Sequence, residues 1–234
     1  MPVPMCSLGR RRPGSFGGER RANVTDASAL TLPASYFDAV YAADDDPWRF
    51  ETSAYEAAKY ADSVAALGDR RFASAFEIGC SIGVLTRSLA VCCEQLFAVD
   101  ISEAALRQAR RRCADLPQVE FDRIDVTREF PQCRFDLVVM SEVGYYWSRP
   151  DLDRVLERIA AALLPGGLLL LVHWIADVAD YPLRGDDVHE AALGRATADG
   201  AMRPVSGWRR ENYRLDLLER RHATAAAPVE GASR

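Results

Sequence analysis

A short loop between residues 77 and 83 has the residue types to bind a ligand through its backbone and one carboxylate. It reads Glu77-Ile-Gly79-Cys80-Ser81-Ile-Gly83, after an apolar run and before a segment with helical spacing. Glycines let the backbone approach a ligand, and the first N–H groups of a helix are free to donate to it. The carboxylate of Glu77 would accept a hydrogen bond from a cationic amino group and would repel a pyrophosphate. The loop therefore predicts a site for a cationic, amino-acid-like ligand.

A second carboxylate follows at a spacing that suits a ribose. Asp100 closes the next apolar run, 21 residues after Gly79. An acidic residue at about this distance accepts hydrogen bonds from both hydroxyls of a ribose diol. Dinucleotides and S-adenosylmethionine (SAM) are both bound in this way. The dinucleotide pattern G-x-G-x-x-G fails here, because Ser81 and Val84 occupy its later glycine positions, so SAM is favoured over a nicotinamide cofactor.

Alternating strands and helices must position these groups. The apolar runs predict strands, and the amphipathic segments between them predict helices. This β-α order indicates a doubly wound, mostly parallel α/β sheet, and a final hairpin brings it to seven strands. The expected strands are Ala75–Ile78, Leu96–Val99, Val119–Ile124, Phe135–Met140, Leu168–Trp174, and roughly 201–210 and 213–219; the expected helices are Val84–Cys93, Ser102–Cys113 and Asp151–Leu164.

An aromatic, helical segment precedes the first strand. Residues 34–67 have helical spacing, which Asp44–Pro47 interrupts and Gly68 ends. The predicted organisation is a disordered tail over 1–30, a helical cap over 31–70, a SAM-binding domain over 71–222 and a second disordered tail over 223–234. The aromatic residues Tyr36, Tyr41, Trp48 and Tyr55 of this cap would form a lid over the cofactor. Packing of the cap on the sheet is the alternative, and it is the expectation for Tyr41.

Composition excludes several classes of protein. The chain has 234 residues, 49% of them hydrophobic, so it can bury a large core without disulfides. A net charge of -5 argues against a nucleic-acid partner. The longest aliphatic run, Leu168–Val172, is too short to span a membrane. The six cysteines form no CxxC pair and the N-terminal residues lack a signal-peptide core, which together predict a cytoplasmic protein.

These segments together resemble the class I SAM-dependent methyltransferases. Four stretches carry the resemblance: Glu77–Gly83, with Ser81 in place of the middle glycine, Ile124-Asp125-Val126, Phe135–Glu142, and Pro165-Gly166-Gly167. The resemblance implies a Rossmann-like fold, and it places Asp125 against the adenine amino group. The cofactor-binding residues expected from the loop, the resemblance and the lid are Glu77, Gly79, Cys80, Gly83, Asp100, Ile101, Asp125, Val126, Ser141, Trp48 and Tyr55.

A closer resemblance is to the nodulation protein S (NodS) type of methyltransferase. It rests on residues outside the common motifs: Tyr36-Phe37, Tyr41, Asp46-Pro47-Trp48, Ser53–Glu56, Lys59-Tyr60, Ser141–Val143, Tyr145-Tyr146, Tyr181–Leu183 and Gly185-Asp186. It implies N-methylation of the free amine of a deacetylated chitooligosaccharide or a related amino sugar. O- or N-methylation of another small molecule is the alternative enzyme function. An inactive SAM-binding regulator is the alternative without catalysis.

Two polar residues at predicted strand ends are the candidate catalytic groups. Glu142 would act as a base or would orient the amine; a place in the cofactor pocket is the alternative. His173 is the other candidate base, with a structural role as its alternative. The aromatic residues expected to hold the acceptor are Tyr145, Tyr146, Trp174 and Tyr181. His189 and His222 are expected at the surface. No metal is predicted, because Tyr145 and Tyr146 stand where some related methyltransferases have a Glu and a His ligand.

Overall fold

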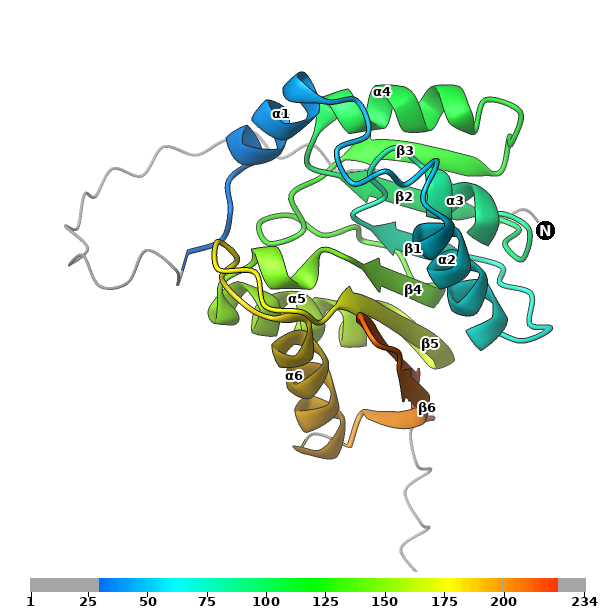
Figure 1. Ribbon diagram of the computed structural model, residues 1–234. Coiled ribbons are helices and arrows are strands. Elements are labelled where there is room, and N and C mark those ends of the chain that lie inside the picture. Colours follow the sequence, from blue (N-terminus) through cyan, green and yellow to red (C-terminus); the bar gives the residue numbers. More distant parts are fainter. Residues whose placement is uncertain (1–29, 199, 223–234) are drawn as a thin grey trace, which may run out of the picture.

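A computed structural model describes residues 30–198 and 200–222, and it contains one seven-stranded sheet (Figure 1). The strand order is β3-β2-β1-β4-β5-β7-β6. The first five strands are parallel, and β7 runs antiparallel to both β5 and β6. The doubly wound sheet with a final hairpin is thus confirmed. The bounds are β1 Ala75–Ile78, β2 Leu96–Asp100, β3 Val119–Arg123, β4 Phe135–Ser141, β5 Leu163–Trp174, β6 Met202–Arg209 and β7 Tyr213–Arg220.

Three of the helices are preceded by a serine that caps them. Ser53, Ser102 and Ser148 each accept a hydrogen bond from the backbone N–H three residues later, which satisfies one free donor of the helix they precede. Figure 1 shows α1 beside α4 and α2 beside α3. The bounds are α1 Ala34–Ala43, α2 Ala54–Ala66, α3 Val84–Leu89, α4 Glu103–Arg112, the short 3₁₀ helix η2 Gly144–Tyr146, α5 Arg149–Ala162 and α6 Gly185–Ala198.

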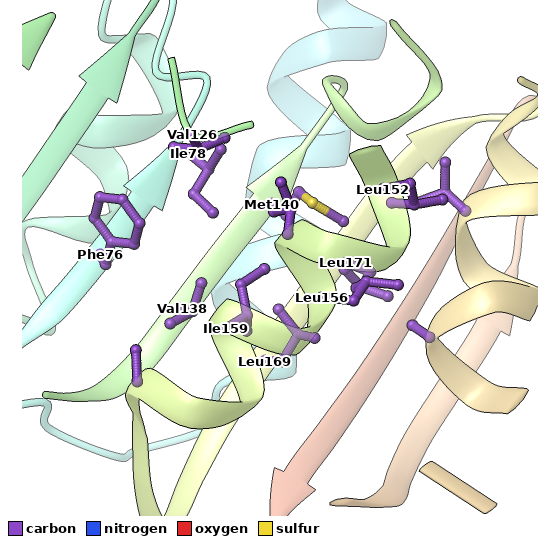
Figure 2. Close-up of a cluster of buried hydrophobic side chains, with 14 of the residues drawn as sticks. Phe76, Ile78, Val126, Val138, Met140, Leu152, Leu156, Ile159, Leu169 and Leu171 are labelled. Carbon is purple, nitrogen blue, oxygen red and sulfur yellow. The ribbon is translucent and has the colours of Figure 1, made fainter. Parts of the chain in front are cut away.

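The two faces of the sheet have separate apolar cores, because successive side chains of a strand point to opposite sides. On one face, Val138 and Met140 of β4 and Leu169 and Leu171 of β5 pack against α5 and α6 (Figure 2). On the other face, their sequence neighbours pack against α2 and α3. Burial on both faces explains why these strands are continuous apolar runs. The pairing fixes the carboxyl ends of all five parallel strands at one edge.

Some expectations about the elements were wrong in detail. Helix α6 was not expected, because its sequence is rich in charge and contains a glycine. Helix α3 ends at Leu89, so Cys92 and Cys93 follow it instead of lying on it. The expected tails over 1–30 and 223–234 fall, apart from residue 30, outside the described residues. In the part of the chain that the structure describes, no helix has both the length and the apolar character to cross a membrane.

Candidate active site

A cavity of about 510 Å³ opens at the carboxyl ends of the parallel strands, beneath the cap helices. This edge is where ligands bind in doubly wound sheets. The cavity is lined by all but two of the predicted site residues: Trp48, Tyr55, Glu77, Gly79, Cys80, Asp100, Ile101, Asp125, Val126, Ser141, Glu142, Tyr145, Tyr146, Trp174 and Tyr181. The exceptions are Gly83 and His173. Tyr41, for which packing was expected, also lines the cavity.

Glu77 is a buried acid with an unused oxygen. Its side chain lies at the end of β1 and is 1% exposed. Its Oε2 has no hydrogen-bond partner among the described residues. Burial raises the pKa of Glu77 to about 7; the nearby hydroxyl of Thr86 opposes this rise, and Asp100 adds to it. A buried, unpartnered carboxylate oxygen is costly, and a cationic group of a ligand would remove that cost.

Asp100 is held in place by two backbone donors. The N–H of Ser81 donates to Oδ2 at 2.9 Å, and the N–H of Ser102 donates to Oδ1 at 2.8 Å. Each carboxylate oxygen can accept two hydrogen bonds, so one acceptor position remains on each. Two adjacent acceptor positions on one rigid carboxylate match the two hydroxyls of a ribose.

The residues present therefore fit SAM. The unpaired oxygen of Glu77 suits its ammonium group, and the two remaining acceptor positions of Asp100 suit its ribose. Asp125 lies at the far side of the cavity, where its Oδ1 accepts hydrogen bonds from the backbone and the hydroxyl of Thr127. Trp48 and Phe50 stack, with ring centroids 5.6 Å apart, and supply aromatic surface from the cap. The roles given to these single residues stay predictions.

Gly83 has a packing function that the sequence did not indicate, and its expected contact with the cofactor stays a prediction. It is the N-cap of α3 and has φ 81°, so a side chain would be strained there. A Cβ at this position would lie 2.9 Å from the backbone Cα of Ala109 in α4. The glycine thus allows close packing of α3 against α4, and it lies outside the cavity.

Glu142 occupies the opposite end of the cavity in a strained backbone conformation, with φ 55°. Three donors hold its carboxylate. Lys59 Nζ donates to Oε1 at 2.6 Å, and the Tyr145 hydroxyl donates to Oε2 at 2.6 Å. The backbone N–H of Trp174 also donates to Oε2, at 2.9 Å. One acceptor position is left, on Oε1. With three of its four acceptor positions filled, the carboxylate has one place for the N–H of a ligand, which suits an orienting group.

Aromatic rings surround this end of the cavity. Tyr145 and Tyr181 are stacked, with ring centroids 5.2 Å apart and an interplanar angle of 9°. The rings of Tyr55 and Trp174 meet edge to face, with their centroids 5.7 Å apart. The hydroxyl of Tyr55 is buried and has no hydrogen-bond partner among the described residues. These rings form a partly polar wall of the kind that carbohydrate rings pack against.

His173 does not reach the cavity. It is fully buried, and its Nε2 accepts a hydrogen bond from the N–H of Gly144 at 3.2 Å. Its proton therefore lies on Nδ1 and is donated to Nε2 of His189 at 3.1 Å. The Nδ1–H of His189 then donates to Asp216 at 2.6 Å. Burial lowers the pKa of both histidines. This geometry favours the structural alternative for His173, and the expectation that His189 lies at the surface was wrong.

Sequence reasoning missed two charged residues of the site. Lys59 and Glu56 line the cavity from α2, although they were noted only for the family resemblance. A lysine and a glutamate on an amphipathic helix normally face water, so nothing in the pattern indicated their burial. As for metal ions, the described residues contain no cluster of three His, Cys, Asp or Glu side chains arranged to hold one. The absence of a metal from the reaction stays a prediction.

The strand order, the antiparallel β7 between β5 and β6, and a cavity over the Glu77–Gly83 loop define the class I SAM-dependent methyltransferase fold. The family model for nodulation protein S matches residues 39–173, more than half of the sequence. The chain belongs to the NodS family.

Individual relatives agree with this assignment. Nodulation protein S of Bradyrhizobium diazoefficiens is 39% identical over 128 residues, a match that covers 54% of this chain and 61% of that protein. The chain thus spans less than two thirds of this relative's length. The crystal structure of N-methyltransferase NodS from Bradyrhizobium japonicum with S-adenosylhomocysteine (SAH) has a TM-score of 0.70 at 21% identity, covering 80% of this chain and 98% of that one. A Pseudomonas syringae protein provisionally assigned as a methyltransferase is 34% identical with a TM-score of 0.62, covering 71% and 99%.

Proposed function

We propose that this protein is a SAM-dependent N-methyltransferase that methylates the free amine of a deacetylated chitooligosaccharide or a related amino sugar. Family membership supports the reaction, since the Bradyrhizobium japonicum neighbour is an N-methyltransferase. The acidic character of the cavity supports the amine. The absence of a suitable membrane helix from the described residues is compatible with a cytoplasmic location, which we include in the proposal.

The charged residues that line the cavity are the observation that supports an amine as the acceptor. Five carboxylates and one ammonium line the cavity: Glu56, Glu77, Asp100, Asp125, Glu142 and Lys59. No arginine of the described residues lines it. The chain as a whole has 29 basic residues, so arginine was available. An acceptor with carboxylate or phosphate groups would meet repulsion here, because no guanidinium is present to pair with it. An amine becomes cationic as it is methylated, and carboxylates stabilise that charge.

The residues of the chain supply alignment and electrostatics. SAM, when bound, supplies an electrophilic methyl group on a cationic sulfonium. Glu142 would accept an N–H of the neutral amine with the remaining acceptor position on Oε1, which points the amine's lone pair away from the carboxylate. Tyr145, Tyr181 and Trp174 would hold the sugar ring. The amine would bind with its proton already lost to water, and Lys59 and Tyr145 would hold the Glu142 carboxylate that orients it.

The decisive experiment compares two acceptors that differ only in acetylation. SAH release would be measured with a deacetylated chitin oligosaccharide and with its fully acetylated twin, and the product mass would be read in parallel. Turnover with the free amine alone, with a product heavier by one or more methyl groups, supports the proposal. If the chain binds SAH but methylates neither sugar, the amino-sugar acceptor is wrong, and other amines and hydroxyls become the candidates. If SAH does not bind, the enzyme function itself is wrong.

A further inference from the structure

Lys59 is the only lysine among the 29 basic residues of the chain. It lies on α2 and is 1% exposed, so its ammonium is removed from water. Burial of an ammonium is unfavourable unless opposite charges pair with it. All other basic residues of the chain are arginines. The one lysine ammonium, which is a more compact charge than a guanidinium, lies at the acceptor end of the cavity.

Two carboxylates share this single ammonium. Lys59 Nζ lies 2.6 Å from Oε1 of Glu142 and 2.9 Å from Oε2 of Glu56. The Lys59 ammonium also lies 5.3 Å from the ring centroid of Tyr55. We call Glu56, Lys59 and Glu142 the charged trio. The trio sets two carboxyl groups against one ammonium in a buried setting, next to the unpartnered hydroxyl of Tyr55.

The position of Lys59 determines what Glu142 can do. The ammonium occupies one acceptor position of Oε1, while Tyr145 and the backbone of Trp174 occupy Oε2. The carboxylate is therefore fixed in rotation, with a single acceptor position left for a ligand. The hydroxyl of Tyr145 is fixed by the same carboxylate, and its ring is the one stacked on Tyr181. One lysine on the cap thus orders both the carboxylate and the aromatic wall.

We infer that Lys59 is a positioning residue for the acceptor: it holds Glu142 so that the free acceptor position of Oε1 receives an amine of the substrate, and the trio then stabilises the positive charge that this amine gains on methylation. This inference rests on the proposed function for the nature of the acceptor. Lys59 does not touch the reacting atoms in this scheme, because its hydrogen-bond donors are directed at Glu56 and Glu142.

Two variants separate positioning from charge balance. Lys59→Met removes the ammonium and leaves two buried carboxylates unpaired, which lowers both stability and turnover. The double variant Glu56→Gln/Lys59→Met returns the site to one negative charge, so it should regain most of the melting temperature. Its kcat/KM for the acceptor should stay about 100-fold below wild type, with SAH affinity within about twofold. Arg87→Met is the matched control, because it removes an exposed ion pair with Asp115 outside the cavity. Recovery of both stability and kcat/KM in the double variant would overturn the inference.

A spectroscopic experiment tests the same inference without turnover. Because the sequence has one lysine, protein labelled with ¹³Cε-lysine gives one methylene signal to follow. With SAH present, glucosamine and methylammonium should shift this signal, N-acetylglucosamine should not, and Glu142→Gln should abolish the response. If no amine shifts the signal, the inference is wrong. If simple amines shift it but no chitooligosaccharide is methylated, the inference stands and the proposed acceptor is wrong.

Discussion

The phenolic oxygen of Tyr41 and the hydroxyl oxygen of Ser81 lie 2.5 Å apart and share a hydrogen bond. The pair joins the cap helix α1 to the Glu77–Gly83 loop. Ser81 stands where the family pattern has a glycine, and its φ is 51°, a region that costs a serine conformational energy. Its N–H also donates to Asp100. One serine therefore connects the cap, the loop and the carboxylate expected to bind the ribose.

We expect Tyr41→Phe to weaken SAH binding about two- to tenfold, the effect of one hydrogen bond. The ring would keep its edge contact with Trp48, so the cap should stay folded. The measurement is calorimetric titration of SAH. Ser81→Gly removes the bond from the other side, and the two changes combined should lose no more affinity than either one alone. Additive losses would show that the Tyr41–Ser81 bond does not couple the cap to the ligand.

Glu77→Gln should stabilise the protein in the absence of ligand, and the gain should grow with pH. The folded-state pKa of Glu77 is about 7 against an ordinary value of 4.5, with burial as the main cause. The folded chain therefore keeps a proton that the unfolded chain releases, and stability falls as pH rises between these values. The cost above the folded pKa is on the order of 3 kcal/mol. Urea unfolding of both proteins from about pH 5 to about pH 8 measures it. A difference that does not change with pH would contradict the buried, unpaired state of Glu77.

The same carboxyl predicts the pH dependence of ligand binding. An ammonium group paired with Glu77 favours the ionised carboxylate, so binding of SAH must release the proton. Affinity of the wild type should therefore rise with pH up to about 7 and then level off. In Glu77→Gln this rise should be absent, and SAH should bind more weakly throughout. Isothermal titration in two buffers of different ionisation heat would detect the released proton. Equal heats in both buffers would contradict the pairing.

Substitutions at the two ends of the cavity should separate binding from turnover. Asp100→Ala removes the expected ribose acceptor and should weaken SAH binding by about 10-fold or more, since hydrogen bonds to a charged group are involved. Glu142→Gln should leave SAH affinity within about twofold and lower kcat by about 100-fold, because the acceptor loses its orienting charge. Equilibrium binding and initial rates on the same samples provide both quantities. Loss of SAH binding in both variants would contradict the role of Glu142.

The packing role of Gly83 can be tested by comparing the stability cost of a glycine-to-alanine substitution at Gly83 with the cost at Gly68. Both glycines have positive φ, 81° and 63°, but a Cβ on Gly68 would meet nothing within 4 Å. Gly68→Ala should therefore cost about 1 kcal/mol of backbone strain. Gly83→Ala adds a clash with the backbone of Ala109 and should cost about 2–4 kcal/mol, measured by chemical denaturation. Equal losses would mean that α3 and α4 can move apart to admit the methyl group.

The centre of the sheet was predictable because strands such as β4 and β5 are buried on both faces. Runs such as Leu137–Met140 have no polar position, and short loops separate them from amphipathic helices, so both the type and the order of the elements follow. The ends of elements were less predictable. Leu163 and Leu164 continue the helical spacing of α5, yet Leu163 pairs with Phe135 and begins β5. Tertiary pairing here decided between two conformations that the local sequence allows.

Residues of the cavity were predictable where glycines and acidic residues follow strands at a recognisable spacing, as at Glu77, Gly79 and Asp100. It was not predictable where burial depends on a distant partner. Lys59 and Glu142 are 83 positions apart, and only the packing of α2 over the end of β4 makes them neighbours. The same holds for His189, whose burial depends on Asp216 in β7. Whether a charged residue on a helix is buried can be known only once the position of the helix in the fold is known.

The insertion of β7 between β5 and β6 has a consequence for the time course of folding on the ribosome. The cap helix α2 contacts this late strand, since the Tyr213 hydroxyl donates to Asp62 at 2.6 Å across 151 positions of the chain. Until residue 213 has emerged, one edge of β5 has no partner and α2 lacks this anchor. Strand edges of this kind invite pairing with other chains, and contacts of long sequence separation form slowly. We therefore expect the nascent chain to depend on chaperone protection until its last strand is made.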